Sequence, residues 1–262
     1  MLIAHVSDLH IGRDARTDEA ARSVAEALED AGVGAVVLTG DVTNRGRAAE
    51  LETFRAMFGR LLARRRFWVV PGNHDRLGDG AGDAFMRGAR VSVEQSPGLH
   101  VVRLDSTGPH NRHLLAAHGL LTLADLNAVD SALAAAPEGA LTVLALHHHL
   151  LPLPGDGLGE RIADLFGLPH VTELPLGAAL LARIQGRCDL VLHGHRHVPA
   201  ELVLGAATDR PLRVLNAGAT GHLGSIRVLS ARGNRVTDAE WLEIDGAGAR
   251  PLAGALVGRA AV

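Results

Sequence analysis

Three histidines stand at alternate positions directly after an aliphatic run in the stretch DLVLHGHRHVP, residues 189–199. They are His193, His195 and His197, and the run of residues 190–192 before them has the composition of a buried strand. Imidazole is unusual at the end of such a strand unless a turn satisfies it or it binds a metal, and it is a common ligand of transition metals. The spacing therefore raises the hypothesis that this strand ends in part of a metal site.

Four further apolar runs also end in side chains that can bind a cation. The residues concerned are Asp8 and His10 after residues 2–6, Asp41 after 35–39, Asn73 and His74 after 67–70, and His147 after 141–146. In α/β sheets the carboxyl ends of the strands lie side by side and form the usual ligand crevice, so these residues are expected to converge. Gly40, Gly72 and Gly194 would let the backbone turn tightly there and would keep side chains clear of the site.

The donor atoms of these residues indicate which cations they would hold. Carboxylate oxygen, amide oxygen and imidazole nitrogen suit manganese, iron, cobalt, nickel or zinc, and the lack of thiolates argues against a structural zinc site. The candidate ligands are too many for one ion, and a carboxylate can bridge two cations about 3.5–4 Å apart. Two divalent ions with Asp8 and Asp41 would leave a net positive charge, which attracts a phosphate and makes a bound water more acidic.

The ordered set DLH, GD, GNHD, a lone histidine after a strand, and GHRH, within residues 8–197, resembles the calcineurin-like metallophosphoesterase superfamily. The start MLIAHVSDLHIG and the short length are most similar to its bacterial branch of class III cyclic-nucleotide phosphodiesterases and related small-phosphodiester hydrolases. The resemblance implies an α/β fold, a four-layer α/β/β/α sandwich of two mixed β-sheets flanked by helices.

The same resemblance implies roles for individual residues. One metal would be held by Asp8, His10, Asp41 and His197, and a second by Asp41, Asn73, His147 and His195, with Asp41 bridging. His74 would contact the phosphate and protonate the leaving group. Several relatives carry an aspartate that can support this histidine where the present sequence has Asn44, so a carboxylate partner for His74 is in question.

The predicted function is that of a dinuclear-metal phosphodiesterase acting on a small phosphodiester, with a 3′,5′-cyclic nucleotide as the first candidate. The metals would be two divalent or mixed-valence ions of manganese, iron, zinc, cobalt or nickel. Other phosphoryl hydrolases stay open: a phosphomonoesterase, a nucleotide-sugar pyrophosphatase or a nuclease. A non-catalytic scaffold of the same fold is the alternative from another class. Arg76 and Asn111 are candidate substrate contacts, and residues 152–175 could form a loop over the site.

The elements that must position these residues alternate between strand and helix. Amphipathic helices are predicted over 18–31, 51–62 and 177–185, and Thr122 with Asp125 forms a plausible capping box for another. After residue 200 short apolar runs follow one another with no helix between them, which predicts strands that complete a second sheet. We expect one domain over residues 1–245 and a frayed, Ala/Gly-rich tail over 246–262.

Composition limits the remaining function classes. The net charge is −3, so no basic footprint predicts binding of long nucleic acid. Cys188 is the single cysteine, which rules out a disulfide within the chain and fits a reducing compartment. The sequence shows neither a secretion signal nor an apolar stretch for a membrane, so a cytoplasmic protein without a membrane partner is expected. A homo-oligomer stays open.

Overall fold

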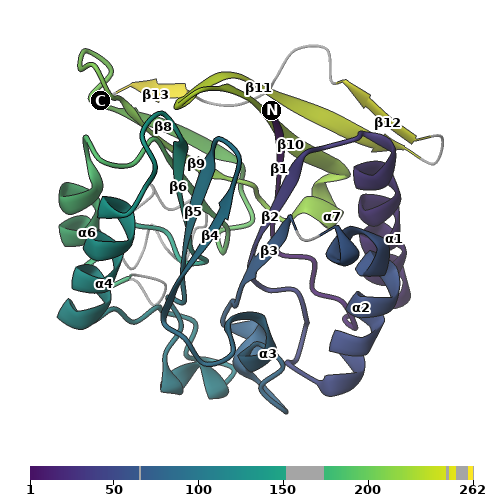
Figure 1. The fold of residues 1–262 in the computed structure, drawn as a ribbon. Coiled ribbons are helices and arrows are strands. Elements are labelled where there is room, and N and C mark those ends of the chain that lie inside the picture. Colours follow the sequence, from purple (N-terminus) through teal and green to yellow (C-terminus); the bar gives the residue numbers. More distant parts are fainter. Residues whose placement is uncertain (65, 152–173, 246–247, 252–258, 262) are drawn as a thin grey trace.

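Two β-sheets pack face to face, and helices cover the outer face of each, as Figure 1 shows. The computed structural model describes residues 1–64, 66–151, 174–245, 248–251 and 259–261. The fold is the mixed α/β sandwich that the sequence motifs imply, with two mixed sheets flanked by helices. No helix in the described part of the chain is long and apolar enough to cross a membrane.

The first sheet has the strand order β12-β11-β10-β1-β2-β3. Its strands are β1 (Leu2–Val6), β2 (Ala35–Thr39), β3 (Phe67–Val70), β10 (Ser225–Arg232), β11 (Arg235–Asp245) and β12 (Gly248–Pro251). Strands β1, β2 and β3 are parallel to one another, so their carboxyl ends share one edge. Helices α1 (Ala15–Asp30) and α2 (Ala48–Ala63) lie on the outer side of this sheet (Figure 1).

The second sheet has the order β13-β8-β9-β7-β6-β5-β4. Its strands are β4 (Val91–Ser96), β5 (Leu99–Leu104), β6 (Leu141–Ala145), β7 (Leu190–His193), β8 (Ala200–Leu204), β9 (Leu212–Asn216) and β13 (Arg259–Ala261). Strands β5, β6, β7 and β9 run parallel. Helices α4 (Leu123–Ala134) and α6 (Gly177–Ile184) cover its outer side, and the short helices are η1 (His74–Arg76), α3 (Asp83–Met86), η2 (Pro109–Arg112) and α7 (Thr220–Leu223).

Three apolar cores lie between the four layers. Along β2, Val37 packs in the core between the sheets, whereas Val36 and Leu38 pack in the core under α1 and α2. Along β6, Val143 faces the other sheet and Leu144 faces the layer of α4 and α6. Successive side chains of a strand point to opposite faces, so a strand buried on both faces is apolar throughout. This explains why the strands next to the site read as continuous apolar runs.

Helix starts follow from capping side chains. The side chain of Thr122 accepts a hydrogen bond from the backbone N–H of Asp125, which confirms the capping box expected for α4. Helix α1 begins at Ala15, three residues before the predicted start, because Asp14 caps it by accepting from the N–H of Thr17.

The late strands correct one expectation. Only β8, β9 and β13 join the second sheet, whereas β10, β11 and β12 extend the first, where β10 pairs antiparallel with β1. Apolar runs in sequence do not specify which of two sheets a strand will join. Of residues 246–262, which we expected to be frayed, the described segments pair in strands: β12 with β11 and β13 with β8. The division into one domain and a tail stays a prediction.

Candidate metal centre

The carboxyl ends of five strands, three from one sheet and two from the other, meet at one edge of the sandwich. Two groups of metal-binding side chains lie there, each with its donor atoms within 4.8 Å of one another. The first group is Asp8, His10, Asp41 and His197; the second is His147, His148 and His195. The first group is the ligand set expected for one metal.

In the first group, polar atoms face one another in a way that hydrogen bonding does not satisfy. The Nε2 atoms of His10 and His197 are 3.1 Å apart, and Nε2 of His197 is 3.3 Å from Oδ1 of Asp8. Oδ1 of Asp8 is buried and has no hydrogen-bond partner among the described residues. Burying a carboxylate oxygen without a partner is costly, and a cation placed among these donors would remove that cost. These residues therefore fit a bound metal ion.

The second group is centred on His147, which is completely buried. Its Nδ1 donates to the carbonyl oxygen of Thr39 at 2.7 Å, so its Nε2 is left to bind a cation. This Nε2 lies 3.1 Å from Oδ1 of Asn73 and 3.2 Å from Nδ1 of His195. The three residues expected to hold the second metal with Asp41 are thus brought together.

His148 has a different part although it lies in this group. Its Nε2 donates to the carbonyl of Ala117 at 3.0 Å, and its Nδ1 lies 2.8 Å from the hydroxyl of Ser106. The same hydroxyl accepts from the backbone N–H of His147. Both ring nitrogens of His148 therefore have partners, and the residue supports the loop that carries His147. No motif indicated Ser106, which follows β5 and comes close to His147 and His148 only in the fold.

Asp41 belongs to the first group and also faces the second. Its Oδ2 is 3.9 Å from Nε2 of His10 and 3.4 Å from Nε2 of His147. Its Oδ1 accepts a hydrogen bond of 2.8 Å from the backbone N–H of His74, which fixes the orientation of the carboxylate. One oxygen that faces a ligand from each group is the geometry that a bridging carboxylate requires.

The charges of the centre depend on burial and on the carboxylates. Burial alone would raise the pKa of Asp41, but the neighbouring His147 lowers it well below its usual range. Burial lowers the pKa of His147, yet the Asp41 charge outweighs it and raises the pKa to about 9. Burial lowers the pKa of His10 to about 4. His10 is therefore a neutral donor near pH 7. His147 is protonated without a metal, and it releases this proton when a cation binds beside Asp41.

The backbone at the candidate ligands adopts conformations that are rare outside glycine. Seven described non-glycine residues have positive φ, and five of them are predicted ligands: Asp8, His10, Asp41, His195 and His197. Such conformations cost on the order of 1–3 kcal/mol each and concentrate at functional sites. A Cβ on Gly72 would lie 2.2 Å from Oδ1 of Asp41, so glycine is required for this approach, as expected from the sequence.

His74 lies beside the two groups. Its ring centroid is 4.7 Å from that of His10, and its Nδ1 donates to the backbone carbonyl of Asn44 at 2.8 Å. Residue 44 therefore does support His74, but through the main chain, so the missing carboxylate is replaced by a carbonyl. This bond orients the ring and leaves Nε2 to exchange a proton with a substrate. The assignment of His74 as the acid stays a prediction.

Asp75 is a positioning residue that was not among the candidate site residues predicted from the sequence. Its buried carboxylate accepts from the backbone N–H of Gly72 at 2.9 Å and from the N–H and hydroxyl of Thr43 at 2.8 and 2.7 Å. It thereby joins the loops after β2 and β3, which carry Asp41 and Asn73. Burial and the Asp41 charge raise the pKa of Asp75 to about 6. Its place in GNHD, directly after two candidate site residues, was the available signal.

The two expected substrate contacts are engaged elsewhere. The guanidinium of Arg76 binds Asp83 and Asp105, and its Nε donates to the hydroxyl of Thr107 at 2.8 Å. Asn111 is buried and closes its own loop, donating to the carbonyls of Ala116 and His118. Both side chains thus hold the 105–118 loop, because acidic and carbonyl acceptors lie within reach. Most of the expected 152–175 loop lies outside the described residues.

Comparisons with known proteins agree with this geometry. A family model described as calcineurin-like phosphoesterase matches residues 1–199. No curated protein sequence matches the chain. A dimetal phosphatase from Danio rerio is similar in structure, with a TM-score of 0.63 and 11% identity over 92% of this chain and 94% of that one.

Two further solved structures show how widely the fold is used. A purple acid phosphatase from yellow lupin (Lupinus luteus) seeds has a TM-score of 0.63 and 12% identity over 96% of this chain and 52% of that one. A protein described as the anchor in the inner membrane complex of Plasmodium has a TM-score of 0.55 and 12% identity over 94% and 89%. At these identities the likeness concerns the fold alone.

Proposed function

Because the chain belongs to the calcineurin-like phosphoesterase family, and is a metal-dependent phosphoric ester hydrolase, we propose that it hydrolyses a small phosphodiester. The first candidate substrate is a 3′,5′-cyclic nucleotide. The observation that carries the proposal is Asp41, whose Oδ2 faces one imidazole of each ligand group. The preference for a diester is supported by the resemblance of the segment MLIAHVSDLHIG to the phosphodiesterase branch.

The proposed ligands divide between the two groups with Asp41 in common. Asp8, His10 and His197 hold the first cation, and Asn73, His147 and His195 the second. When bound, the two cations supply Lewis acidity toward the phosphate oxygens and toward the attacking water. Manganese, iron, zinc, cobalt and nickel all accept this mixture of oxygen and nitrogen donors.

The remaining steps fall to side chains of this chain. Asp8 and Asp41 hold the cations with a net positive charge left over, so the site attracts an anionic phosphate. His74, oriented by the carbonyl of Asn44, donates a proton to the oxygen that leaves phosphorus. Asp75 keeps the loops of Asp41 and Asn73 in register, so that the ligand groups hold their spacing.

A substrate panel with metal-reconstituted protein tests this function. It compares bis-p-nitrophenyl phosphate with p-nitrophenyl phosphate, and adds cyclic nucleotides, glycerophosphodiesters and nucleotide sugars. We expect a higher kcat/KM for the diester of the nitrophenyl pair, and loss of all activity in Asp41→Asn. A preference for the monoester would identify a phosphomonoesterase. No hydrolysis of any substrate with any of the five metals would favour a non-catalytic scaffold.

A further inference from the structure

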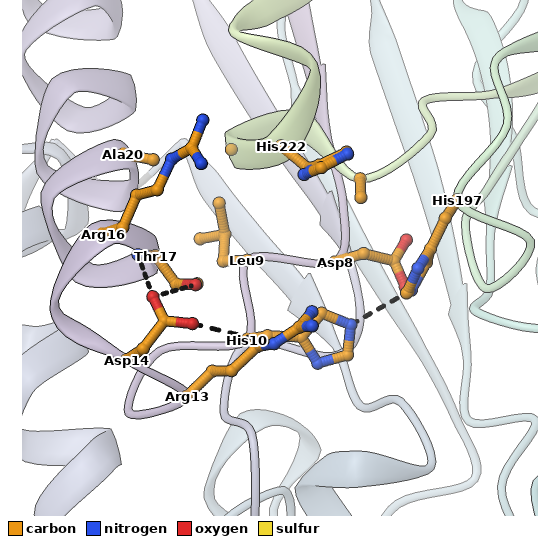
Figure 2. A pocket seen from close by; sticks show the side chains of 12 residues that line it. Asp8, Leu9, His10, Arg13, Asp14, Arg16, Thr17, Ala20, His197 and His222 are labelled. Carbon is orange, nitrogen blue, oxygen red and sulfur yellow. Dashed lines mark hydrogen bonds and ion pairs between the residues drawn. The ribbon is translucent and has the colours of Figure 1, made fainter.

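A cavity of about 580 Å³ opens beside the first ligand group. Its wall includes Asp8, His10 and His197, three of the four side chains of that group. The rest of the wall comes from the segment between β1 and α1, the start of α1, and α7 with the residue before it, as Figure 2 shows. The volume falls in the usual range of small-molecule pockets, roughly 300–1,000 Å³. A group attached to the reacting phosphate therefore has room to extend into this cavity.

Two arginines line the cavity at positions where a helix itself favours acidic side chains. Arg13 precedes Asp14, the N-cap of α1, and Arg16 lies in the first turn. The N-terminus of a helix carries a partial positive charge, so cations there lower the stability of the helix. Helix formation does not account for these two guanidinium groups. Side chains that oppose the local preference are typical of functional sites.

The charge of these arginines has little compensation. Arg16 forms no ion pair or side-chain hydrogen bond within the part of the chain that the structure describes. Nε of Arg13 is 3.9 Å from Oδ2 of Asp14, and both side chains are largely exposed. The Asp14 carboxylate is already engaged by the N–H and hydroxyl of Thr17. His222 of α7 adds an imidazole to the wall (Figure 2). Asp14 lies in the same wall, so the two arginines leave one net positive charge there, beyond that of the candidate metals.

We propose that this cavity binds a second phosphate group of the substrate, and that Arg13 and Arg16 select phosphodiesters that carry one. The inference rests on the proposed function, because the reacting phosphodiester is placed at the ligand groups. It predicts that a phosphodiester with a separate second phosphate group is hydrolysed more efficiently than a 3′,5′-cyclic nucleotide, which has one negative charge. Guanidinium and phosphate pair through charge-assisted, often bidentate hydrogen bonds, about twice as strong as neutral ones.

Two substrates that differ only in this group test the selection. Thymidine 5′-(p-nitrophenyl phosphate) is compared with its 3′-phosphorylated form, so that the leaving group is the same. We expect the wild-type protein to prefer the 3′-phosphorylated substrate by about tenfold or more in kcat/KM. In the double variant Arg13→Gln/Arg16→Gln that preference should fall to about one. Equal losses on both substrates, or no preference in the wild type, would overturn the inference.

The matched control lies on the same helix. Arg22 is exposed, pairs with Glu19 at 3.0 Å and does not line the cavity, so Arg22→Gln should keep the wild-type preference. If Arg22→Gln removed the preference as well, overall charge rather than the cavity would be responsible. Circular dichroism and metal analysis of each variant verify that the fold and the metal content are retained.

Equilibrium binding separates failure of this inference from failure of the proposed function. Calorimetry compares thymidine 3′,5′-bisphosphate with thymidine 5′-phosphate, on wild-type and double-variant protein, with and without manganese. Tighter binding of the bisphosphate that requires Arg13 and Arg16 supports the inference even if no diester is hydrolysed. Binding of inorganic phosphate that is as tight and as dependent on these arginines would contradict it, because the site would then take a free anion.

Discussion

At the scale of single residues, His74 and the candidate ligands around it differ in what their rings contact. His10, His147, His195 and His197 each direct a nitrogen at another donor atom, which is the arrangement of side chains around a cation. His74 instead donates Nδ1–H to a backbone carbonyl and stacks edge-on to His10. This difference supports a division between residues that hold metal and one residue that moves a proton.

His74→Ala should have an effect that depends on the leaving group. An alkoxide leaves poorly without a proton, whereas p-nitrophenolate leaves readily, and general acid catalysis contributes about 10²–10⁴-fold. We expect kcat for a cyclic nucleotide or another alkyl diester to fall by about that factor, and for bis-p-nitrophenyl phosphate much less. Steady-state kinetics on both substrates measure this. An equal fall on both, at unchanged metal content, would mean that His74 stabilises charge instead.

Because His74 is held by the main chain of Asn44, a substitution of the Asn44 side chain serves as a matched control for His74→Ala. The ring is held by the carbonyl of Asn44, and no hydrogen bond joins the Asn44 side chain to it among the described residues. Asn44→Ala should therefore lower kcat on an alkyl diester by less than about threefold, compared with the much larger effect of His74→Ala. Steady-state kinetics of both variants on the same alkyl diester measure this difference in kcat. A loss in Asn44→Ala as large as in His74→Ala would show that the side chain takes part.

At the scale of the elements, the turns after β2 and β7 have no room for a side chain at Gly40 and Gly194. A Cβ on Gly40 would lie 2.5 Å from Nδ1 of His147, and one on Gly194 would lie 1.8 Å from the hydroxyl of Ser7 and 2.4 Å from Oδ2 of Asp8. The turns after β2 and β7 therefore pack directly against ligands from other strands. Glycine at these turns decides how closely the two sheets approach at the site.

Gly194→Ala should displace Asp8 and weaken the first ligand group. The added methyl cannot fit unless Asp8 or the turn moves, and disturbed support of a metal ligand typically lowers affinity by about 10–100-fold. Metal titration by calorimetry should show that one of two binding events is weakened. Gly59→Ala in α2 is the control, because nothing lies within 4 Å of its Cβ position. Unchanged metal affinity in Gly194→Ala would mean that the turn after β7 does not position Asp8.

The elements also show what sequence can and cannot predict here. The positions of Asp8, Asp41 and His147 at strand ends were predictable, because each residue follows an apolar run that is buried on both faces. The apolar pattern of a strand and the residue at which it ends are both local properties of the sequence. The cavity wall that contains Arg13 and His222 was not predictable, because α1 and α7 are far apart in sequence and meet only in the fold. The ion pairs of Arg76 with Asp83 and Asp105 were not predictable either, because these partners are also non-local, and its role as a substrate contact stays a prediction.

At the scale of the whole molecule, buried polar groups join the two sheets. Arg227 of β10 donates to the carbonyls of Ala200 and Asn216 in the second sheet, and its guanidinium lies over the ring of Trp241 at 4.6 Å. His5 of β1 and His193 of β7 are also buried in the interior, where burial lowers the pKa of His193 to about 4 and that of His5 well below its usual value. Folding therefore keeps both histidines neutral.

Acid should destabilise the protein through these histidines. A histidine with a folded pKa below its unfolded value near 6.5 contributes stability above pH 6.5, and that stability is lost as pH falls toward 4. The difference for His193 is about 1.4 kcal/mol per pH unit in this window. Urea unfolding of metal-free protein at pH 7 and pH 5 should therefore show a loss about 2 kcal/mol larger in wild type than in His193→Gln. Equal losses would mean that His193 takes up its proton without unfolding.

Anomalous diffraction from metal-loaded crystals tests whether two metal ions share Asp41. Data collected on either side of the absorption edge of the bound metal locate each ion independently of the protein atoms. We predict two anomalous peaks about 3.5–4 Å apart, with the Asp41 carboxylate between them, one beside His10 and the other beside His147. A single peak, with Asp41 bound to that ion alone, would contradict the account.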